Sequence, residues 1–182
     1  MVICCHIDNA INLYDNVLSI IKLGILTMTE KWTAEGEAVT ALILDVFRLN
    51  GRLVSAGDRL VADLGLTSAR WQVLGALANA ERLESVAWHA RTMGHHRQGV
   101  QRIVNDLEKE GIVEFQPNPH HKRAHLVLLT PKGQKLFESA IALQTPWVNS
   151  LSSGLSLEDI ATAKKVIDRL KAHLEPESEN AP

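Results

Sequence analysis

A group of long polar side chains between residues 97 and 105 has the chemistry to bind a nucleic acid. The same segment carries Val100, Val104 and Leu107 at three- and four-residue steps, which predicts an amphipathic helix with one buried face. Arginine and glutamine on its polar face are able to hydrogen-bond base edges or phosphates. Acidic residues come only later in the segment, so its first half suits a polyanion. The polar residues are Arg97, Gln98, Gln101, Arg102 and Asn105.

A second basic group, His120 to Arg123, follows after a short structured stretch. Apolar residues at 112–115 and 126–129 flank a Pro- and Asn-containing segment, a pattern that predicts a β-hairpin with a broad, basic loop. Two separated basic contacts would fix the orientation of a bound duplex. The residues expected to contact DNA are Arg97, Gln98, Gln101, Arg102, His96, Lys122 and Arg123.

Turn and capping signals define the elements that hold these residues. Ser85 is a good N-cap for a short helix that ends before Gly94, and a second helix runs from about Arg97 to Gly111. Two short helices joined by a glycine-containing turn predict a helix-turn-helix. With the hairpin that follows, residues 83–130 form a predicted winged helix-turn-helix.

Helices are also predicted on both sides of this unit. Residues 33–64 show the periodicity of a long amphipathic helix that stops at Gly65, and Thr67 or Ser68 caps the next helix, to about residue 79. Thr130 and Pro131 open a further helix, which Pro146 should break or kink. Ser156 and Asp159 resemble a capping box for a last helix to residue 174.

These elements predict a mainly α (α+β) fold in three segments. Residues 1–29 form an N-terminal extension, expected to be helical and upstream of an alternative start at Met28. Residues 30–175 form the winged-helix domain, and residues 176–182 an acidic, disordered tail. No uncharged stretch reaches the length of a membrane span.

Composition narrows the class of protein. The formal net charge of −2 excludes a broadly basic protein that coats nucleic acid without selectivity, so DNA contacts must be local. The two cysteines, Cys4 and Cys5, are adjacent, which offers neither a disulfide framework nor zinc-finger spacing and favours a reducing cytoplasm. The sequence contains neither a nucleophile–base set nor a phosphate-cradling loop, so nothing in it indicates an enzyme, and no cofactor is expected.

The run SVAWHARTMGHHRQGVQRIVNDLEKEG, from Ser85 to Gly111, followed by IVEFQPNPHHKRAHLVLLTPKGQ, resembles the winged helix of the MarR family of bacterial regulators. This resemblance implies a homodimer built from N- and C-terminal dimerisation helices. It also implies a recognition helix in the major groove, with a wing near the adjacent minor groove. Arg97, Gln98, Gln101 and Arg102 would then face DNA, and Arg123 takes the place of the family's wing arginine.

Histidines replace residues that are usual in that family. His121 stands where an aspartate normally steadies the wing arginine, and His95 and His96 stand in place of an aliphatic residue and a hydroxyl cap, while His89 replaces an aliphatic residue. Three interpretations remain open: tolerated boundary residues, a metal site, or pH-dependent DNA binding. In the last case, protonation of His95, His96, His120 and His121 would tighten binding.

The leading functional hypothesis is a repressor-like dimer on a pseudo-palindromic operator, with half-sites about one helical turn apart and a small-molecule effector that modulates binding. Trp71 and Arg70 are effector-site candidates by position only. The alternative is a protein-interaction module, in which the helix face docks a protein instead of DNA. Steep salt dependence would distinguish DNA binding from an apolar protein interface.

Overall fold

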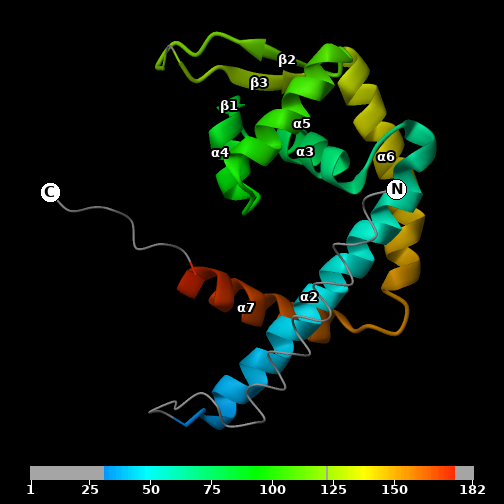
Figure 1. Cartoon of the computed structure of the whole chain (residues 1–182). Helices are drawn as coiled ribbons and strands as arrows, with labels where there is room; N and C mark the ends of the chain where they lie inside the picture. The colour runs from blue at the N-terminus through cyan, green and yellow to red at the C-terminus, as the bar shows by residue number, and fades with distance from the viewer. Residues whose placement is uncertain (1–30, 122, 175–182) are drawn as a thin grey trace, which may run out of the picture. The chain divides into compact units, whose positions relative to one another are not determined.

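The computed structural model describes residues 31–121 and 123–174 of the 182-residue chain. The chain divides into two compact units, residues 1–50 and 51–182. In its described part the first unit contains the beginning of α2 (Ala34–Val61), and the second contains the rest of α2 and every later element (Figure 1). The helix expected within residues 1–29 and the expected tail at 176–182 lie outside the described residues.

The elements before the helix-turn-helix follow the predicted boundaries. The helix α2 continues into a 3₁₀ turn, η1 (Ala62–Leu64), and the chain reverses at Gly65, whose φ of 67° is left-handed. Thr67, rather than Ser68, caps α3 (Ser68–Ala78), because its hydroxyl accepts the Arg70 N–H at 3.3 Å. The Asp58 carboxylate accepts the Ser68 N–H at 2.6 Å and so ties α2 to the start of α3.

The predicted helix-turn-helix is confirmed. The Ser85 hydroxyl caps α4 (Val86–Thr92) by accepting the Trp88 N–H at 3.3 Å, and Gly94 turns the chain with a φ of 67°. The second helix, α5 (Arg97–Lys109), is followed by Gly111 in the same left-handed conformation. Both glycines adopt a backbone conformation that side chains disfavour, which explains why the two turns occur where they do.

Three short strands form an antiparallel sheet in the order β1-β3-β2. The hairpin of β2 (Val113–Gln116) and β3 (Leu126–Leu129) matches the predicted wing, with Phe115 opposite Val127. The strand β1 (Glu84–Ser85) was not predicted. It is only two residues long and is defined by its pairing with β3, a tertiary contact that leaves no periodic signal.

A single hydrophobic cluster lies among α3, α4, α5, the sheet and α6. The helix α5 packs against α3, α4 and β2, while α3 also packs against α6 and β3. Its largest fully buried apolar side chains come from the end of α2, from α3, from α5 and from the wing strands. They are Leu74, Leu107, Val61, Val73, Val104, Val113 and Val127. The resulting winged helix-turn-helix is mainly helical with one small sheet, as predicted.

The helices after the wing are α6 (Pro131–Leu151) and α7 (Leu157–Leu174). The helix α6 is not broken at Pro146, one of the two outcomes expected there, and continues to Leu151 with the proline inside it. A proline inside a helix can kink it without ending it. At α7, the Ser156 hydroxyl accepts the Asp159 N–H at 3.0 Å and donates to the Asp159 carboxylate at 2.6 Å. None of the helices in the described ranges has both the length and the apolar character of a membrane span.

Hydrogen bonds and a close backbone contact hold the start of α6 against the end of α5 and the start of the wing. The Thr130 hydroxyl donates to the carbonyls of Gly111 and Ile112, at 2.8 and 3.1 Å, and accepts the Gly133 N–H at 3.1 Å. A Cβ added at Gly133 would lie 2.0 Å from the Ile112 carbonyl oxygen. The backbone contact therefore requires glycine at this position.

We expect Gly133→Ala to lower the free energy of unfolding by about 2 kcal/mol or more, because the added methyl group collides with backbone that cannot move aside freely. Gly99→Ala is the matched control, since nothing lies within 4 Å of its added Cβ and alanine favours a helix interior. Urea denaturation of both variants measures the effect. Equal stability of Gly133→Ala and the parent would show that the junction is not a tight constraint.

Candidate nucleic-acid interface

The burial of one face of α5 decides which of its side chains reach solvent. Val100, Val104 and Leu107 are buried in the core, with Ile103 packed against it, so the polar residues on the other side of the helix point outward. Gln101 is half-buried at the edge of the helix. The polar residues expected to contact DNA that are exposed on or beside α5 are His96, Arg97, Gln98 and Arg102. A shallow groove along this helix is lined by both arginines and both glutamines.

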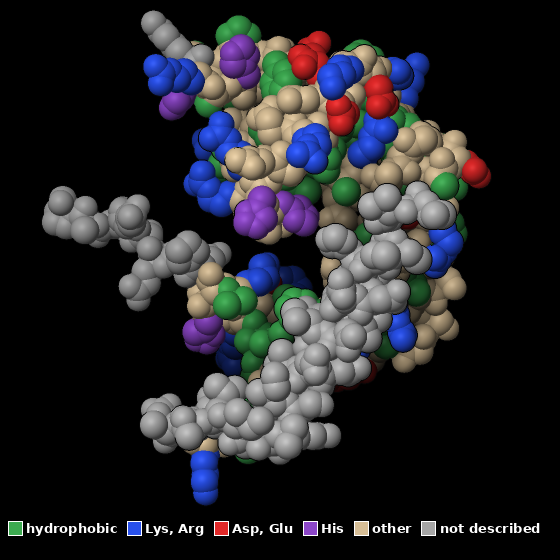
Figure 2. All heavy atoms as spheres, viewed as in Figure 1, with side chains coloured by type: hydrophobic (Ala, Val, Ile, Leu, Met, Phe, Trp, Pro, Cys, Tyr) green, Lys and Arg blue, Asp and Glu red, His purple; other side chains and the backbone are tan. Residues whose placement is uncertain are grey.

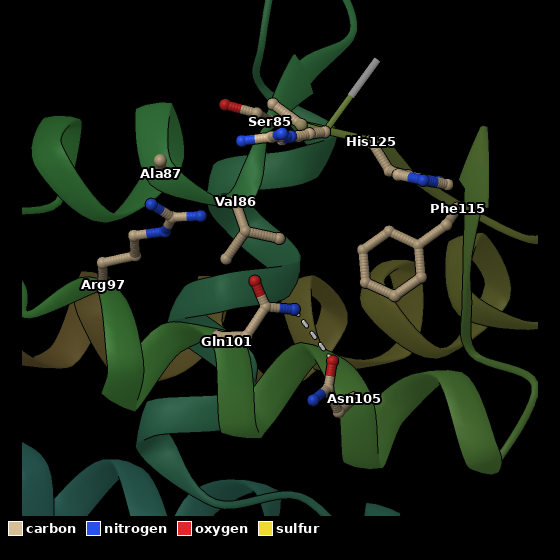
Figure 3. Close-up of a pocket in the computed structure, with 10 residues that line it drawn as sticks. Ser85, Val86, Ala87, Arg97, Gln101, Asn105, Phe115 and His125 are labelled. Atoms are coloured by element: carbon tan, nitrogen blue, oxygen red, sulfur yellow. Dashed lines mark hydrogen bonds between the residues drawn. The ribbon is translucent and has the colours of Figure 1, made fainter. Parts of the chain in front are cut away.

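A cavity of about 310 Å³ lies between α5, the start of α4 and the wing. Arg97 and Gln101 reach it from α5, and Arg123 lines it from the wing. Figure 3 shows Arg97 at one end and Phe115 with His125 at the other, with Gln101 between them. The structure therefore brings three sequence-predicted residues, from two separate elements, around one cavity.

The charges on this side of the winged helix are unbalanced. No carboxylate lines the cavity among α4, α5 and the wing, and neither Arg97 nor Arg123 forms an ion pair with a described residue. In Figure 2, Lys, Arg and His side chains follow the left edge of the upper part of the molecule, while acidic side chains lie to its right. This edge presents positive charge locally on a chain whose formal net charge is −2.

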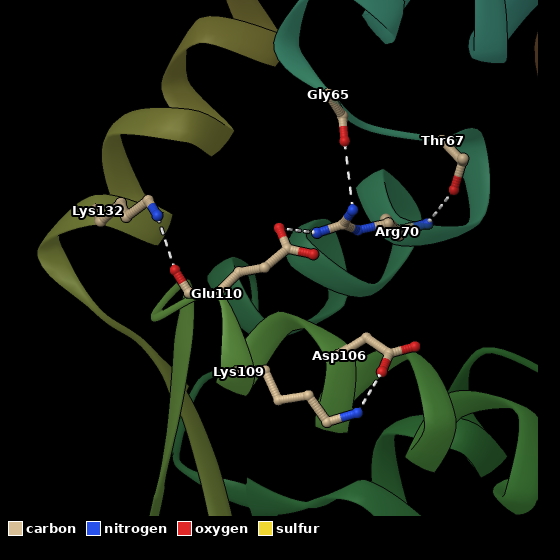
Figure 4. Close-up of polar contacts among 7 residues, drawn as sticks. All are labelled: Gly65, Thr67, Arg70, Asp106, Lys109, Glu110 and Lys132. Carbon is tan, nitrogen blue, oxygen red and sulfur yellow. Dashed lines mark hydrogen bonds and ion pairs between the residues drawn. The ribbon is translucent and has the colours of Figure 1, made fainter.

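Two of the three acidic side chains near the end of α5, Asp106 and Glu110, form ion pairs, whereas the exposed Glu108 forms none with a described residue. Glu110 forms an ion pair with Arg70, whose guanidinium also donates to the Gly65 carbonyl at 3.3 Å (Figure 4). Asp106 pairs with Lys109 at 2.9 Å, and the hydrogen bond from Lys109 lowers the pKa of the Asp106 carboxyl. Arg70 is thus a structural tie between α3 and α5, which speaks against its use as an effector ligand.

The beginning of α5 lacks a side-chain cap. His96 occupies the N-cap position and its imidazole forms no capping hydrogen bond, while its carbonyl accepts the Gly99 N–H at 3.0 Å. The N–H groups of a first helical turn have no partners within the helix. The Gly99 N–H is used within the turn, whereas the Arg97 and Gln98 N–H groups have no partner among the described residues and can face an anion.

The wing arginine, Arg123, lacks the aspartate partner that the family resemblance would provide, because His121 stands at that position. Arg123 is exposed and has no carboxylate partner among the described residues, and His121 is exposed beside it. Lys122 lies outside the described residues, so its predicted DNA contact stays a prediction. His125 and Phe115 complete the cavity but were not predicted as binding residues, since no motif or periodicity singles them out.

The histidines do not form a metal centre in the part of the chain that is described. No group of three or more His, Cys, Asp or Glu side chains there has the arrangement to hold a metal ion. His95 and His96 lie in the turn before α5, whereas His120 and His121 lie at the tip of the wing. The described residues therefore offer no support for the metal-site interpretation of these four histidines.

His89 differs from these histidines because it is buried inside α4, 2% exposed. Neither ring nitrogen has a hydrogen-bond partner, and the ring meets Trp88 edge-on with centroids 5.1 Å apart. Burial lowers the pKa of His89 below the usual 6.5, and the Glu84 carboxylate offsets this only in part. The helix that supports α5 therefore contains a neutral imidazole that resists protonation.

The free energy of unfolding should fall as the pH decreases below about 6.5, because the unfolded chain then protonates His89 more readily than the folded chain. The contribution of this residue is at most about 1.4 kcal/mol per pH unit. His89→Leu should remove that part of the pH dependence and raise stability at pH 5.5. Urea denaturation at pH 5.5 and 7.5 tests this, with the exposed His120→Ala as control. An unchanged pH dependence in His89→Leu would contradict it.

The fold and its charged edge define a winged helix-turn-helix protein, and comparisons with known proteins identify its family. The sequence profile of the MarR family matches residues 64–124. An uncharacterized protein from Mycobacterium tuberculosis is 38% identical over 103 residues, which cover 57% of this chain and 71% of the relative. The chain therefore belongs to the MarR family of transcription regulators.

Two further similar proteins carry functional names. The transcriptional activatory protein BadR of Rhodopseudomonas palustris is 30% identical over 107 residues, 58% of this chain and 61% of BadR. The crystal structure of a mutant MarR from E. coli, complexed with operator DNA, matches with a TM-score of 0.59 and 25% identity. The match covers 70% of this chain and 94% of that one.

Proposed function

We propose that this protein regulates transcription by binding double-stranded DNA through α5 and the wing. The observation that carries the proposal is the cavity edge where Arg97, Gln101 and Arg123 converge without a carboxylate. In this arrangement α5 enters the major groove and the wing lies along the adjacent minor groove. The contacting residues are Arg97, Gln98, Gln101, Arg102, His96, Lys122 and Arg123.

The order of charges along α5 supports an approach by its first half. Arg97 and Arg102 are exposed there, and the backbone N–H groups that follow His96 at the start of α5 donate to no side-chain cap. The carboxylates of Asp106 and Glu110 are neutralised by Lys109 and Arg70 in the second half. A phosphate near the helix start gains both the cationic side chains and the helix dipole.

We further propose that the protein acts as a homodimer on a pseudo-palindromic operator. Large apolar side chains are exposed on α6 and α7, a surface that a monomer in water would not favour. They are Ile141, Leu143, Val148, Leu151, Leu157, Ile160, Val166, Ile167 and Leu174. A twofold dimer presents two α5 helices to successive turns of the major groove, which explains a palindromic site.

Regulation by repression and by a small-molecule effector completes this proposal. A dimer bound across promoter DNA prevents other proteins from binding there. A ligand that favours another spacing between the winged helix-turn-helix units of the two subunits would release the dimer from DNA. We assign no catalytic role or cofactor to the chain. We also propose residues 30–175 as the regulatory domain, preceded by an extension and followed by an acidic tail. A promoter–reporter assay with and without the protein decides between repression and the activation that BadR's name describes.

Dimerisation should depend on the apolar face of α7. Ile160→Asp combined with Ile167→Asp is expected to shift the protein from dimer to monomer, because charges would be buried in the interface. Analytical ultracentrifugation measures the change, and Arg169→Asp, which adds an aspartate on the opposite face of the same helix, is the control. A dimer that survives the double substitution would place the interface elsewhere.

DNA binding should depend on both arginines of the cavity. We expect Arg97→Ala to cost about 1 to 3 kcal/mol of binding free energy and to relax sequence preference, as for a base contact. Arg123→Ala should weaken binding to all duplexes more evenly. Fluorescence anisotropy with duplexes from the DNA flanking the coding region measures both, and Arg169→Ala on α7 is the charge-matched control.

The salt dependence of the same complex separates DNA binding from protein docking. An affinity that falls steeply between 50 and 200 mM salt is expected for contacts to several phosphates. If both arginine variants bind like the parent, the assigned DNA face is wrong. Duplex binding that is absent at every salt concentration would instead favour the protein-interaction alternative.

A further inference from the structure

The cavity between α5 and the wing has a second feature, an imidazole at its wing end. His125 immediately precedes β3 and is exposed, and its ring meets the Phe115 ring edge-on, with centroids 6.3 Å apart and planes at 89°. Both rings line the cavity (Figure 3). Phe115 lies in β2 and pairs with Val127 of β3, so the ring that supports His125 is fixed by the sheet.

The groups around His125 leave it without an anionic partner in the free protein. From α5, the charged group that lines the cavity is Arg97, and from the wing it is Arg123. Ser85 of β1, Val86 and Ala87 at the start of α4, and Phe115 of β2 also line the cavity, and none of them is titratable. Glu84, the other residue of β1, forms an ion pair with Arg82 and does not line the cavity. Neither His125 nor the two arginines forms an ion pair with a described residue.

The geometry of duplex DNA indicates what fills such a cavity. A sugar–phosphate strand separates the major groove from the adjacent minor groove. When a protein places one element in each groove, this strand lies between the two elements. Here the two elements are α5 and the wing, and the space between them is the cavity of about 310 Å³. Polar and cationic side chains in its lining suit phosphate oxygens.

We propose that this cavity receives the sugar–phosphate strand between the two grooves, and that His125 binds one phosphate there as an imidazolium, which couples DNA affinity to pH. The inference rests on the proposed DNA binding by α5 and the wing. It assigns the pH response to a residue that lies inside the interface rather than to the histidines of the turn and the wing tip. Histidine changes charge between pH 5 and 8, and a bound phosphate favours its protonated form.

The test compares binding at pH 6.0 and pH 8.0 on the duplex from the flanking DNA, by anisotropy at fixed salt. The parent should bind about five- to tenfold more tightly at pH 6.0, as expected for one added charge-assisted contact to phosphate. His125→Gln should lose most of the difference in affinity between pH 6.0 and pH 8.0, whatever its affinity at pH 8.0. His125→Lys should bind at pH 8.0 about as tightly as the parent at pH 6.0, because its charge is permanent.

Two controls make the result specific. His120→Gln, at the wing tip and outside the cavity lining, should keep most of the parent's pH response. The slope of log affinity against log salt at pH 6.0 should be steeper in the parent than in His125→Gln by about 0.9, the value for one phosphate contact. A merely structural role of His125 would not change this slope.

The outcomes separate this inference from the proposed function. If the parent binds the duplex in a salt-dependent manner but His125→Gln keeps the full pH response, the role of His125 is wrong and DNA binding stands. The same holds if His125→Lys gives no gain at pH 8.0. If the parent binds no duplex at either pH, the proposed function fails and this inference fails with it.

Discussion

The burial of the apolar face of α5 is the constraint on which the rest of the structure depends. Val100, Val104 and Leu107 are each at most 2% exposed, and burying side chains of this size contributes about 1.5 to 3 kcal/mol each. Rotation of the helix about its axis would bring these residues to the surface. The polar residues of its first half are therefore held outward by the core, whether or not a ligand is present.

Contacts at the end of α5 fix the position of the wing relative to this helix. Thr130 and Gly133 hold the turn after α5 against the start of α6, and the Glu110–Arg70 pair ties the same end to α3. Because β2 begins directly after this turn, the wing starts from an anchored position. The cavity between α5 and the wing is therefore bounded by elements that are anchored to the same core.

Most of the fold could be predicted from local signals, whereas the cavity could not. Ser85, Thr130 and the left-handed glycines mark helix ends through short-range hydrogen bonding, so the helix-turn-helix boundaries were correct. The break allowed for at Pro146 does not occur, because the local rule that proline disrupts a helix does not account for the turns on either side of it, which continue α6 to Leu151. His125 and β1 depend on contacts across the sheet, and their significance appears only when β3 lies beside its partners.

The most direct test of this account is backbone amide hydrogen exchange of the protein with and without the duplex from its flanking DNA. Amides at the start of α5 and at the wing base, around residues 96–102 and 123–126, should exchange more slowly when the duplex is bound, because phosphates and base edges cover them. Protection confined to other elements, with these two segments unchanged, would contradict the claim that α5 and the wing form the DNA-binding surface.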